Sequence, residues 1–520
     1  MCPEAEPPGA AHHNGWGAIS RNPYNRHVTS GESPEGEVRR QVWPWLLLLA
    51  VLALALQGLR PLWEPDEGRY AAVALRMLRS GDWLTPTLHH EVVHFTKPPL
   101  LYWLMAAACA VLGPSEWAFR LPAAFAYAGT VLLVTRIARR LVPGRELLAG
   151  LVQATSLLPF LAASLVTTDS LLAFWETLAI ASYVELRWGD GGRRARWLFW
   201  LALAAGFLTK GPPGLMPVAA IAVWRLWQGF SGGAPVMRSR LFQPDAIAAG
   251  LFVALAWFAL EALRHPNLPV YWLRDEVAGR LASAEQGRNP GLRGLFVAFL
   301  PVILLGAQPW LTTALLRGSR PMEPRPAGSG RFLASWLIAP AVIFTLAQSR
   351  LPLYLVPLAP PASLLIARRL RPWGRRGWLA LALWAVALLA IRAGGAAVPG
   401  AADGKVFARR LAAVLPQPPG ELVFVDSRPH YSLVVYLGSE VEWIRIHPPD
   451  HDSEHTYAPL YDSLADELVE KEPHRYYLVP TAKVEPFVRA LDERGYAARP
   501  LGAVEGFSVF DDPRRFPPHG

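Results

Sequence analysis

The chain has 520 residues, of which 52% are hydrophobic and only 18% are charged, a composition that excludes an ordinary soluble enzyme of this length. Its formal net charge is +10, but most of the arginines stand in short clusters between apolar runs, as orientation signals do in membrane proteins. We therefore expect the lipid bilayer as a partner and no nucleic acid. The cysteines, Cys2 and Cys109, are far apart, which predicts neither a disulfide framework nor a cysteine-based metal site.

The N-terminal part of the chain changes character near residue 42. Residues 1–41 lack apolar periodicity, which predicts a disordered cytoplasmic tail. The apolar run 43–59 follows Arg39 and Arg40 and has no small-residue cleavage site, which predicts an uncleaved helix whose N-terminus is inside. The run 98–113 is shorter than the roughly 20 residues that a full span needs, so we expect it to be re-entrant or interfacial.

The remaining apolar runs place arginine clusters on the inner side at each return of the chain. This predicts an α-helical polytopic membrane protein with about 11–13 transmembrane helices. The further runs are 117–135, 147–166, 171–186, a short segment ending at Leu208, 214–227, 246–263, 295–315, 332–346, 353–366 and 378–391.

Three regions are expected: the tail 1–41, a membrane region 42–397 with an outer loop at 60–98, and an extracytoplasmic region 398–520. The last region alternates strand-like runs, "ELVFVD", "VEWIRI", "RYYLVP" and "GFSVF", with helical stretches such as "VEPFVRALDERG". This alternation predicts a small α/β domain.

The outer loop opens with the acidic stretch "EPDEGRY". Its apolar residues continue at helical spacing, which predicts a helix along the membrane surface with the acids at its N-terminus. Glu64 beside a proline fits a cap or a solvated loop. Asp66 and Glu67 also fit a catalytic site, because adjacent acids at the mouth of a lipid-lined cavity are costly unless the chemistry uses them, for example as a general base.

Basic and polar residues stand at other outer corners of the predicted bundle. Lys97 in "HFTKPPLLYW" fits either snorkelling towards headgroups or binding of a membrane-bound phosphate. Asp169 in "TTDS" fits a helix N-cap or a cavity residue. Arg350 and Tyr354 in "SRLPLYLVPLAP" occupy one further corner. The loop "VYWLRDEVAGRL" adds Arg274 and Arg280, and the whole set predicts an outward-facing cavity with carboxylates opposite basic groups.

These motifs, in this order, resemble those of the polyprenyl-phosphate-dependent GT-C glycosyltransferases, which include the bacterial lipid A aminoarabinose transferases and the protein O-mannosyltransferases. The resemblance spans roughly residues 43–397. It is carried by "EPDEGRYAAVALRML", "SGDWLTP", "FTKPPLLYW", "AFRLPAA", "TTDSLLAFW", "FLTKGPPGL" and "SRLPLYLVPLAP".

The resemblance implies a role for each candidate residue. Asp66 would orient or deprotonate the acceptor with the help of Glu67, and Lys97 would hold the phosphate of an undecaprenyl-phosphate donor. Arg280, Tyr354 and Arg350 would complete the phosphate site. Asp169, Tyr70 and Glu64 would line the cavity for the acceptor. The donor already carries a good leaving group, so in-line attack with inversion at the anomeric carbon is expected.

The resemblance implies no required cofactor, although a divalent metal would fit such a site. In aminoarabinose transferases the residue before the phosphate lysine is typically acidic, and some of those enzymes use it in a metal site. Here that residue is Thr96. His89, His90 and His94 are nearby and could supply a ligand, but their spacing also fits a histidine-rich surface loop.

The resemblance implies two functions, and the intramembrane pattern leaves a third open. The first is transfer of a sugar to an envelope glycolipid such as lipid A, at the cell inner membrane. The second is transfer to a Ser or Thr hydroxyl of a protein by the same fold. The third is transport, for which intramembrane acids and interrupted helices would form the site. Against transport, the spans show no two-half repeat and the acids gather in the outer loops.

Overall fold

The computed structural model describes residues 34–89, 92–230, 241–279, 288–318, 326–371, 373–397, 403–447, 462–470 and 474–515. The chain divides into two units, residues 1–48 and 49–520. The first unit contributes the beginning of α1 (Pro34–Leu54) to the described residues. Of the expected tail, residues 1–33 lie outside the described residues and residues 34–41 are helical.

The second unit is mainly helical up to residue 397, as the composition predicts. The helices are α2 (Asp66–Ser80), α3 (Leu100–Leu112), α4 (Glu116–Leu141), α5 (Glu146–Thr155), α6 (Leu157–Ala162), α7 (Thr168–Trp188), α8 (Arg193–Lys210), η1 (Pro212–Leu215), α9 (Met216–Phe230), α10 (Pro244–Arg264), α11 (Leu268–Tyr271), η2 (Trp272–Gly279), α13 (Gly291–Gly294), η3 (Leu295–Phe299), α14 (Leu300–Leu305), α15 (Trp310–Arg317), α16 (Ser329–Leu346), η4 (Pro352–Leu358), α17 (Ala359–Ala367) and α18 (Arg375–Ala397).

Only some of these helices could cross a bilayer unaided. Among the described residues, α4, α10, α16 and α18 are long and apolar enough, and a fifth span results if the bent pair Gly291–Leu305 and Trp310–Leu316 is counted as one. This pair, predicted as the single run 295–315, bends by 69°. Pro309 stands at the bend, where it cannot donate a helical hydrogen bond. The predicted run 147–166 is likewise divided, into α5 and α6.

The helices pack around a core that brings together α4, α7, α8, α9 and α16. Val134, Ile180, Phe199, Trp224 and Trp336 meet there, one from each helix, and all are buried. Because large rings fill this core, the helices that contribute to it form a fixed frame.

The C-terminal domain, residues 403–515, is an α/β sandwich, as its alternating pattern predicts. Its sheet has the order β3-β2-β1-β4-β6-β5; β1 to β4 run parallel where they pair, and β6 is antiparallel to β4 and β5. The strands are β1 (Glu421–Val425), β2 (Glu440–Arg445), β3 (Asp462–Ser463), β4 (Arg475–Pro480), β5 (Pro500–Val504) and β6 (Phe507–Asp511). The helical elements are α19 (Gly404–Ala412), α20 (Leu433–Tyr436), α21 (Leu464–Glu467), η5 (Thr481–Lys483), α22 (Val484–Asp492) and η6 (Pro513–Arg515).

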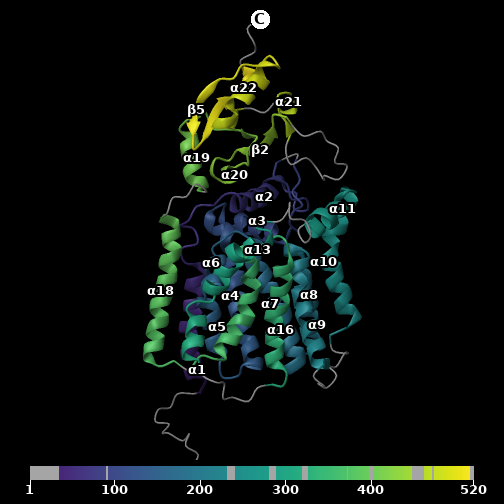
Figure 1. Cartoon of the computed structure of the whole chain (residues 1–520), viewed down its shortest axis with the longest axis vertical. Helices are drawn as coiled ribbons and strands as arrows, with labels where there is room; N and C mark the ends of the chain where they lie inside the picture. Colours follow the sequence, from purple (N-terminus) through teal and green to yellow (C-terminus); the bar gives the residue numbers. More distant parts are fainter. Residues whose placement is uncertain are drawn as a thin grey trace, which may run out of the picture. The chain divides into compact units, whose positions relative to one another are not determined.

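Helix α2 lies between this domain and the membrane helices (Figure 1). Tyr70 and Ala74 pack with residues of α3 and α4, whereas Ala72 and Leu75 pack with the sheet, α19 and α20. The helix ends where Gly81 adopts a left-handed conformation with φ of 74°. The expected amphipathic surface helix is therefore present, but it is covered on both sides. The predicted domain boundaries at 41/42 and 397/398 stay predictions.

Candidate active site

A cavity of about 680 Å³ opens among the helices, with the 95–98 segment on its wall. Most of its lining is apolar. The charged groups on its wall are Lys97, Asp169, Lys210 and Glu276. The remaining lining residues include Phe95, Thr96, Leu172, Phe207, Met216, Leu255, Phe258, Ala262, Trp272, Leu273, Phe344, Ser349 and Tyr354. An apolar cavity with a few converging charges suits an amphiphilic ligand with a charged head.

Asp169 forms an ion pair that sequence reasoning missed. Its Oδ1 lies 2.5 Å from Lys210 Nζ, and both side chains are largely buried. Lys210 Nζ also lies 4.3 Å from the ring centroid of Tyr354. Asp169 is thus not the N-cap of α7, a position held by Thr167. A signal was present in the sequence, because "TKGPP" at Lys210 repeats the character of "TKPP" at Lys97.

Lys97 lies on the same cavity wall, as the phosphate-binding hypothesis requires. Its ammonium donates to Thr96 O at 2.7 Å and lies 3.7 Å from Glu276 Oε2. The Thr96 hydroxyl pairs with His94 Nε2 at 2.7 Å. Glu276 was not predicted, and nothing in the local sequence distinguished it from its acidic neighbour Asp275.

Asp66 is the first residue of α2, and its side chain is 42% exposed. Its carboxylate accepts from Arg69 at 2.6 Å and lies 4.0 Å from Arg288, a partner that the sequence did not predict. Tyr70, which the sequence placed in the cavity, is buried and is not among the residues that line this cavity. Burial raises the pKa of Tyr70, and the charges of Arg69, Lys210, Asp66 and Asp169 all act on its phenol.

Glu67 lies in a closed, buried network of arginine side chains and backbone amides. Arg60 binds both of its carboxylate oxygens at 2.8 and 2.7 Å, and Arg120 contacts Oε2 at 3.1 Å. The backbone amides of Trp63 and Val166 each donate to it at 2.9 Å. Burial alone would raise the pKa of Glu67, but the guanidinium groups of Arg120 and Arg60 outweigh burial and lower the pKa to about 2.

Arg350 contacts backbone groups rather than the cavity wall. Its guanidinium donates to Gly291 O at 2.9 Å and to Thr345 O at 2.7 Å, and its amide donates to Arg288 O at 2.6 Å. Arg350 thereby holds the segment that carries Arg288 towards Asp66. Arg280, the other predicted phosphate ligand, lies outside the described residues.

Glu64 faces the C-terminal domain. Its Oε1 accepts from the backbone amide of Ser432 at 2.6 Å, and its Oε2 is buried. Burial raises the pKa of Glu64 to about 7, although the hydrogen bonds from the Ser432 region and the charge of Arg69 oppose this shift. The structure thus separates Glu64 from the cavity residues with which sequence reasoning grouped it.

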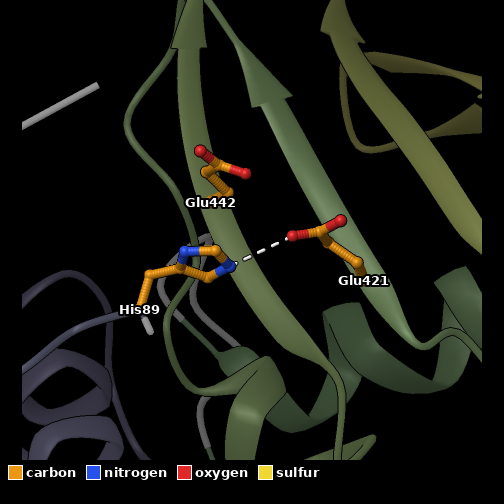
Figure 2. Close-up of side chains that lie close together, drawn as sticks. All are labelled: His89, Glu421 and Glu442. Carbon is orange, nitrogen blue, oxygen red and sulfur yellow. Dashed lines mark hydrogen bonds and ion pairs between the residues drawn. The ribbon is translucent and has the colours of Figure 1, made fainter. Parts of the chain in front are cut away.

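Metal-capable groups gather away from the cavity, at the base of the C-terminal sheet. His89 comes from the outer loop and meets Glu421 and Glu442 of adjacent strands, as Figure 2 shows. His89 Nε2 lies 3.1 Å from Glu421 Oε1, and the second oxygen of Glu421 pairs with Arg475. The donor set suits a divalent ion such as Zn²⁺, but here the guanidinium already occupies one oxygen. The expected histidine-rich surface loop is wrong for His89 and His94, which are buried; His90 lies outside the described residues.

The chain is similar in sequence to known proteins. Residues 42–262 match the family described as dolichyl-phosphate-mannose-protein mannosyltransferase. A relative from Edwardsiella ictaluri (strain 93-146), undecaprenyl phosphate-alpha-4-amino-4-deoxy-L-arabinose arabinosyl transferase, is 31% identical over 344 residues, 62% of this chain and 58% of the relative. The protein of the same name from Yersinia enterocolitica is 32% identical over 331 residues, with coverage of 62% and 57%. The chain thus spans less than two thirds of the length of these relatives.

The fold is that of a solved relative. The crystal structure of ArnT from Cupriavidus metallidurans bound to undecaprenyl phosphate superposes with a TM-score of 0.74 at 20% identity, covering 92% of this chain and 98% of that one. Its apo form gives a TM-score of 0.71 with the same coverage. The family resemblance and the helical fold with a C-terminal α/β domain are therefore confirmed. This chain therefore shares the fold of that ArnT structure and, over residues 42–262, is similar to the dolichyl-phosphate-mannose-protein mannosyltransferase family.

Proposed function

We propose that this protein is an inverting glycosyltransferase that moves a sugar from a polyprenyl phosphate, such as undecaprenyl phosphate, to an envelope glycolipid such as lipid A. The observation that carries this proposal is the apolar cavity with Lys97 and Lys210 on its wall. The names of the curated relatives and of the solved ArnT complex support the same donor chemistry.

In this proposal the cavity receives the donor's head group and the first part of its prenyl chain. Lys97 would contact the phosphate by exchanging its ion pair with Glu276, which at 3.7 Å is loose enough to yield to a stronger anion. Tyr354 would contribute its hydroxyl, and Arg280 a second positive charge. Lys210, which also lines the cavity, would add positive charge and is held in place by Asp169.

The reaction breaks the bond between the anomeric carbon and the phosphate oxygen, and forms a bond from the acceptor oxygen to the same carbon. The polyprenyl phosphate leaves with the electron pair, and the lysines stabilise its charge. A phosphate acceptor is already anionic, whereas a hydroxyl acceptor would give its proton to the Asp66 carboxylate. Attack from the face opposite the leaving group inverts the anomeric configuration.

Glu67 would serve by position rather than by proton transfer. Arg60, Arg120 and two backbone amides already bind its carboxylate. Glu67 therefore fixes the loop that leads into Asp66. Arg350 would serve similarly, through the segment that carries Arg288. Glu67 and Arg350 would thus act by positioning Asp66 and its partner Arg288.

The arginine clusters between the apolar runs support an orientation in the inner membrane with the N-terminus in the cytoplasm. The cavity, α2 and the C-terminal domain would then lie on the periplasmic side. This placement suits a lipid-linked donor, because such a donor needs no nucleotide-binding motif on the cytoplasmic face.

The test is mass spectrometry of envelope lipids and glycoproteins from cells that carry wild-type protein, Lys97→Ala or Lys483→Ala. Lys483 is exposed on the C-terminal domain and serves as a matched lysine control. We expect a pentose- or hexose-sized increment on a glycolipid with wild-type and control protein and its loss with Lys97→Ala. An unchanged lipid profile in all strains, with each protein present in the membrane, would contradict the proposal.

A second candidate acceptor is a Ser or Thr hydroxyl of a protein, favoured by the similarity of residues 42–262 to the dolichyl-phosphate-mannose-protein mannosyltransferase family. The same cavity and donor would serve it. The same spectra decide between the two, since the increment would then appear on peptides rather than on lipids.

A further inference from the structure

We propose that the C-terminal domain is part of the catalytic apparatus, because Tyr436 and the amide of Ser432 hold the loop that carries Asp66. Both act as positioning residues, and neither lines the cavity. This inference rests on the proposed transferase function, since it assigns the domain a role in that reaction. Its basis is a set of contacts to Leu62, Trp63 and Glu64, just before Asp66, from residues more than 300 positions later in the chain.

Both polar groups of the Leu62 backbone form hydrogen bonds with the C-terminal domain. Its amide donates to the hydroxyl oxygen of Tyr436 at 2.8 Å, and its carbonyl accepts from Gly404 N at 3.2 Å. The next residue, Trp63, forms a bridge with Asp403. Leu62 itself is fully buried. Each backbone group would otherwise lack a partner on burial, so these bonds fix where the loop runs.

Glu64 forms the second contact, two residues before Asp66. Its carboxylate accepts from Ser432 N at 2.6 Å. The packing around this bond is tight, because a Cβ added at Gly68 would lie 2.4 Å from Glu64 Oε1 and 2.6 Å from Ser432 N. The first turn of α2 therefore touches the C-terminal domain directly, without room for an intervening side chain.

Tyr436 links the loop to the membrane helices as well. Its hydroxyl donates to Glu116 Oε1 at 3.3 Å at the start of α4, and Lys405 Nζ lies 3.1 Å from the same oxygen. Further along the loop, Arg76 pairs with Glu440 at 2.6 Å and His89 pairs with Glu421 at 3.1 Å (Figure 2). The domain thus holds the loop at its beginning, along α2 and at its far end.

The catalytic consequence follows from the position of Asp66. This residue begins α2, so any shift of the helix start moves its carboxylate relative to the cavity. A displacement of about 1 Å can reduce turnover by up to about a hundredfold while the binding groups on other elements stay in place. Loss of a positioning contact should therefore lower kcat and leave donor binding through Lys97 unchanged.

The experiment compares full-length wild-type protein with Tyr436→Phe, which keeps the ring and removes the hydroxyl. We expect kcat to fall about tenfold, the effect of losing roughly 1.4 kcal/mol of positioning energy. Affinity for polyprenyl phosphate, measured by titration, should stay within about twofold of wild type. Hydrogen exchange of residues 60–70 should become faster. Arg489→Ala, on the exposed face of α22, is the control and should change none of these.

Variants of Glu64 provide the conservative rescue. Glu64→Gln keeps an oxygen for the Ser432 amide and should retain most of the turnover, whereas Glu64→Ala should resemble Tyr436→Phe. The proposal is overturned if kcat and loop exchange of Tyr436→Phe equal those of wild type. It is also overturned if turnover, donor affinity and Tm all fall together, which would indicate a purely structural role. Absence of any transfer by wild type would instead refute the proposed function.

Discussion

Lys210 Nζ lies 2.5 Å from Asp169 Oδ1, at the ends of two adjacent helices and with both side chains largely buried. The pair sits on the wall of the cavity, and the ring of Tyr354 covers the ammonium. The free energy of desolvation offsets much of the attraction between two buried charges. The presence of this pair is therefore better explained by ligand binding than by stability.

Removing one partner of this pair should destabilise the protein more than removing both. Asp169→Asn leaves a buried ammonium without its carboxylate, at a cost of about 3–5 kcal/mol. The double variant Asp169→Asn, Lys210→Met should recover about 0.5–3 kcal/mol of that loss. Thermal unfolding of the single and double variants in detergent checks this. Strictly additive changes in Tm would contradict a coupled pair.

Glu67 should be among the most sensitive positions in the protein. Glu67→Gln leaves the buried guanidinium groups of Arg60 and Arg120 without their shared carboxylate, and we expect a loss of about 3–5 kcal/mol. The lowered pKa of Glu67, about 2, adds a pH dependence. Its stabilisation is present above the pKa of an unfolded glutamate and is lost as the pH falls from about 4.5 to about 2. Unfolding curves for the variant that match wild type at pH 7 would refute this role.

Glu64 should give the opposite pH dependence. Its pKa is raised from 4.5 to about 7, so the folded state favours the protonated form, and stability is fully present below pH 4.5 and declines as the pH rises through about 7. Glu64→Gln cannot ionise and should exceed wild type in stability at pH 8 by at most about 3 kcal/mol. The measurement is Tm from pH 5 to pH 8. If the Tm of the two proteins changed with pH in the same way, Arg69 and the Ser432 amide would already offset the effect of burial on the pKa of Glu64.

Asp66→Asn should separate the two acceptor classes. With a hydroxyl acceptor the carboxylate must take a proton, and its loss should reduce kcat by about a hundredfold to ten-thousandfold. With an anionic phosphate acceptor the same change should cost far less. Assays of purified protein with one donor and both kinds of acceptor test this, and an equal loss on both would count against Asp66 as a base.

The His89, Glu421 and Glu442 group should withstand chelation. Arg475 already pairs with one oxygen of Glu421, and His89 lies beside the other. Dialysis against EDTA should therefore leave the Tm of the full chain unchanged, while Arg475→Met should lower it, because several carboxylates would lose their buried cation. A fall in Tm after EDTA that added Zn²⁺ reverses would instead identify a metal site there.

Local patterns predicted the elements well where one physical rule dominated. The strand-like runs "ELVFVD" and "RYYLVP" are β1 and β4, since short apolar segments rich in valine and tyrosine fit a sheet buried on both faces. The helix that begins at Asp66 was predicted from its apolar spacing. Its environment was not, because the same apolar face fits a lipid surface or a protein domain.

The site was harder to predict because its partners are distant in sequence. Lys97 and Asp66 could be selected from their motifs, and their roles stay predictions. The partners Lys210, Glu276 and Arg288 come from three separate segments, and only folding brings them to the cavity or to Asp66. Glu67 and Arg350 look like catalytic groups in sequence, yet their contacts are with arginines or backbone carbonyls, which composition cannot reveal.

The covering of α2 by residues 403–515 also sets an order of events during synthesis. The helix is made early, but Ala72 and Leu75 find their partners only after the sheet has been translated. Until then the face of α2 that meets the sheet is uncovered and available to chaperones or to wrong contacts. The loop that carries Asp66 can reach its final packing only late, so the protein should stay inactive until most of the chain has emerged.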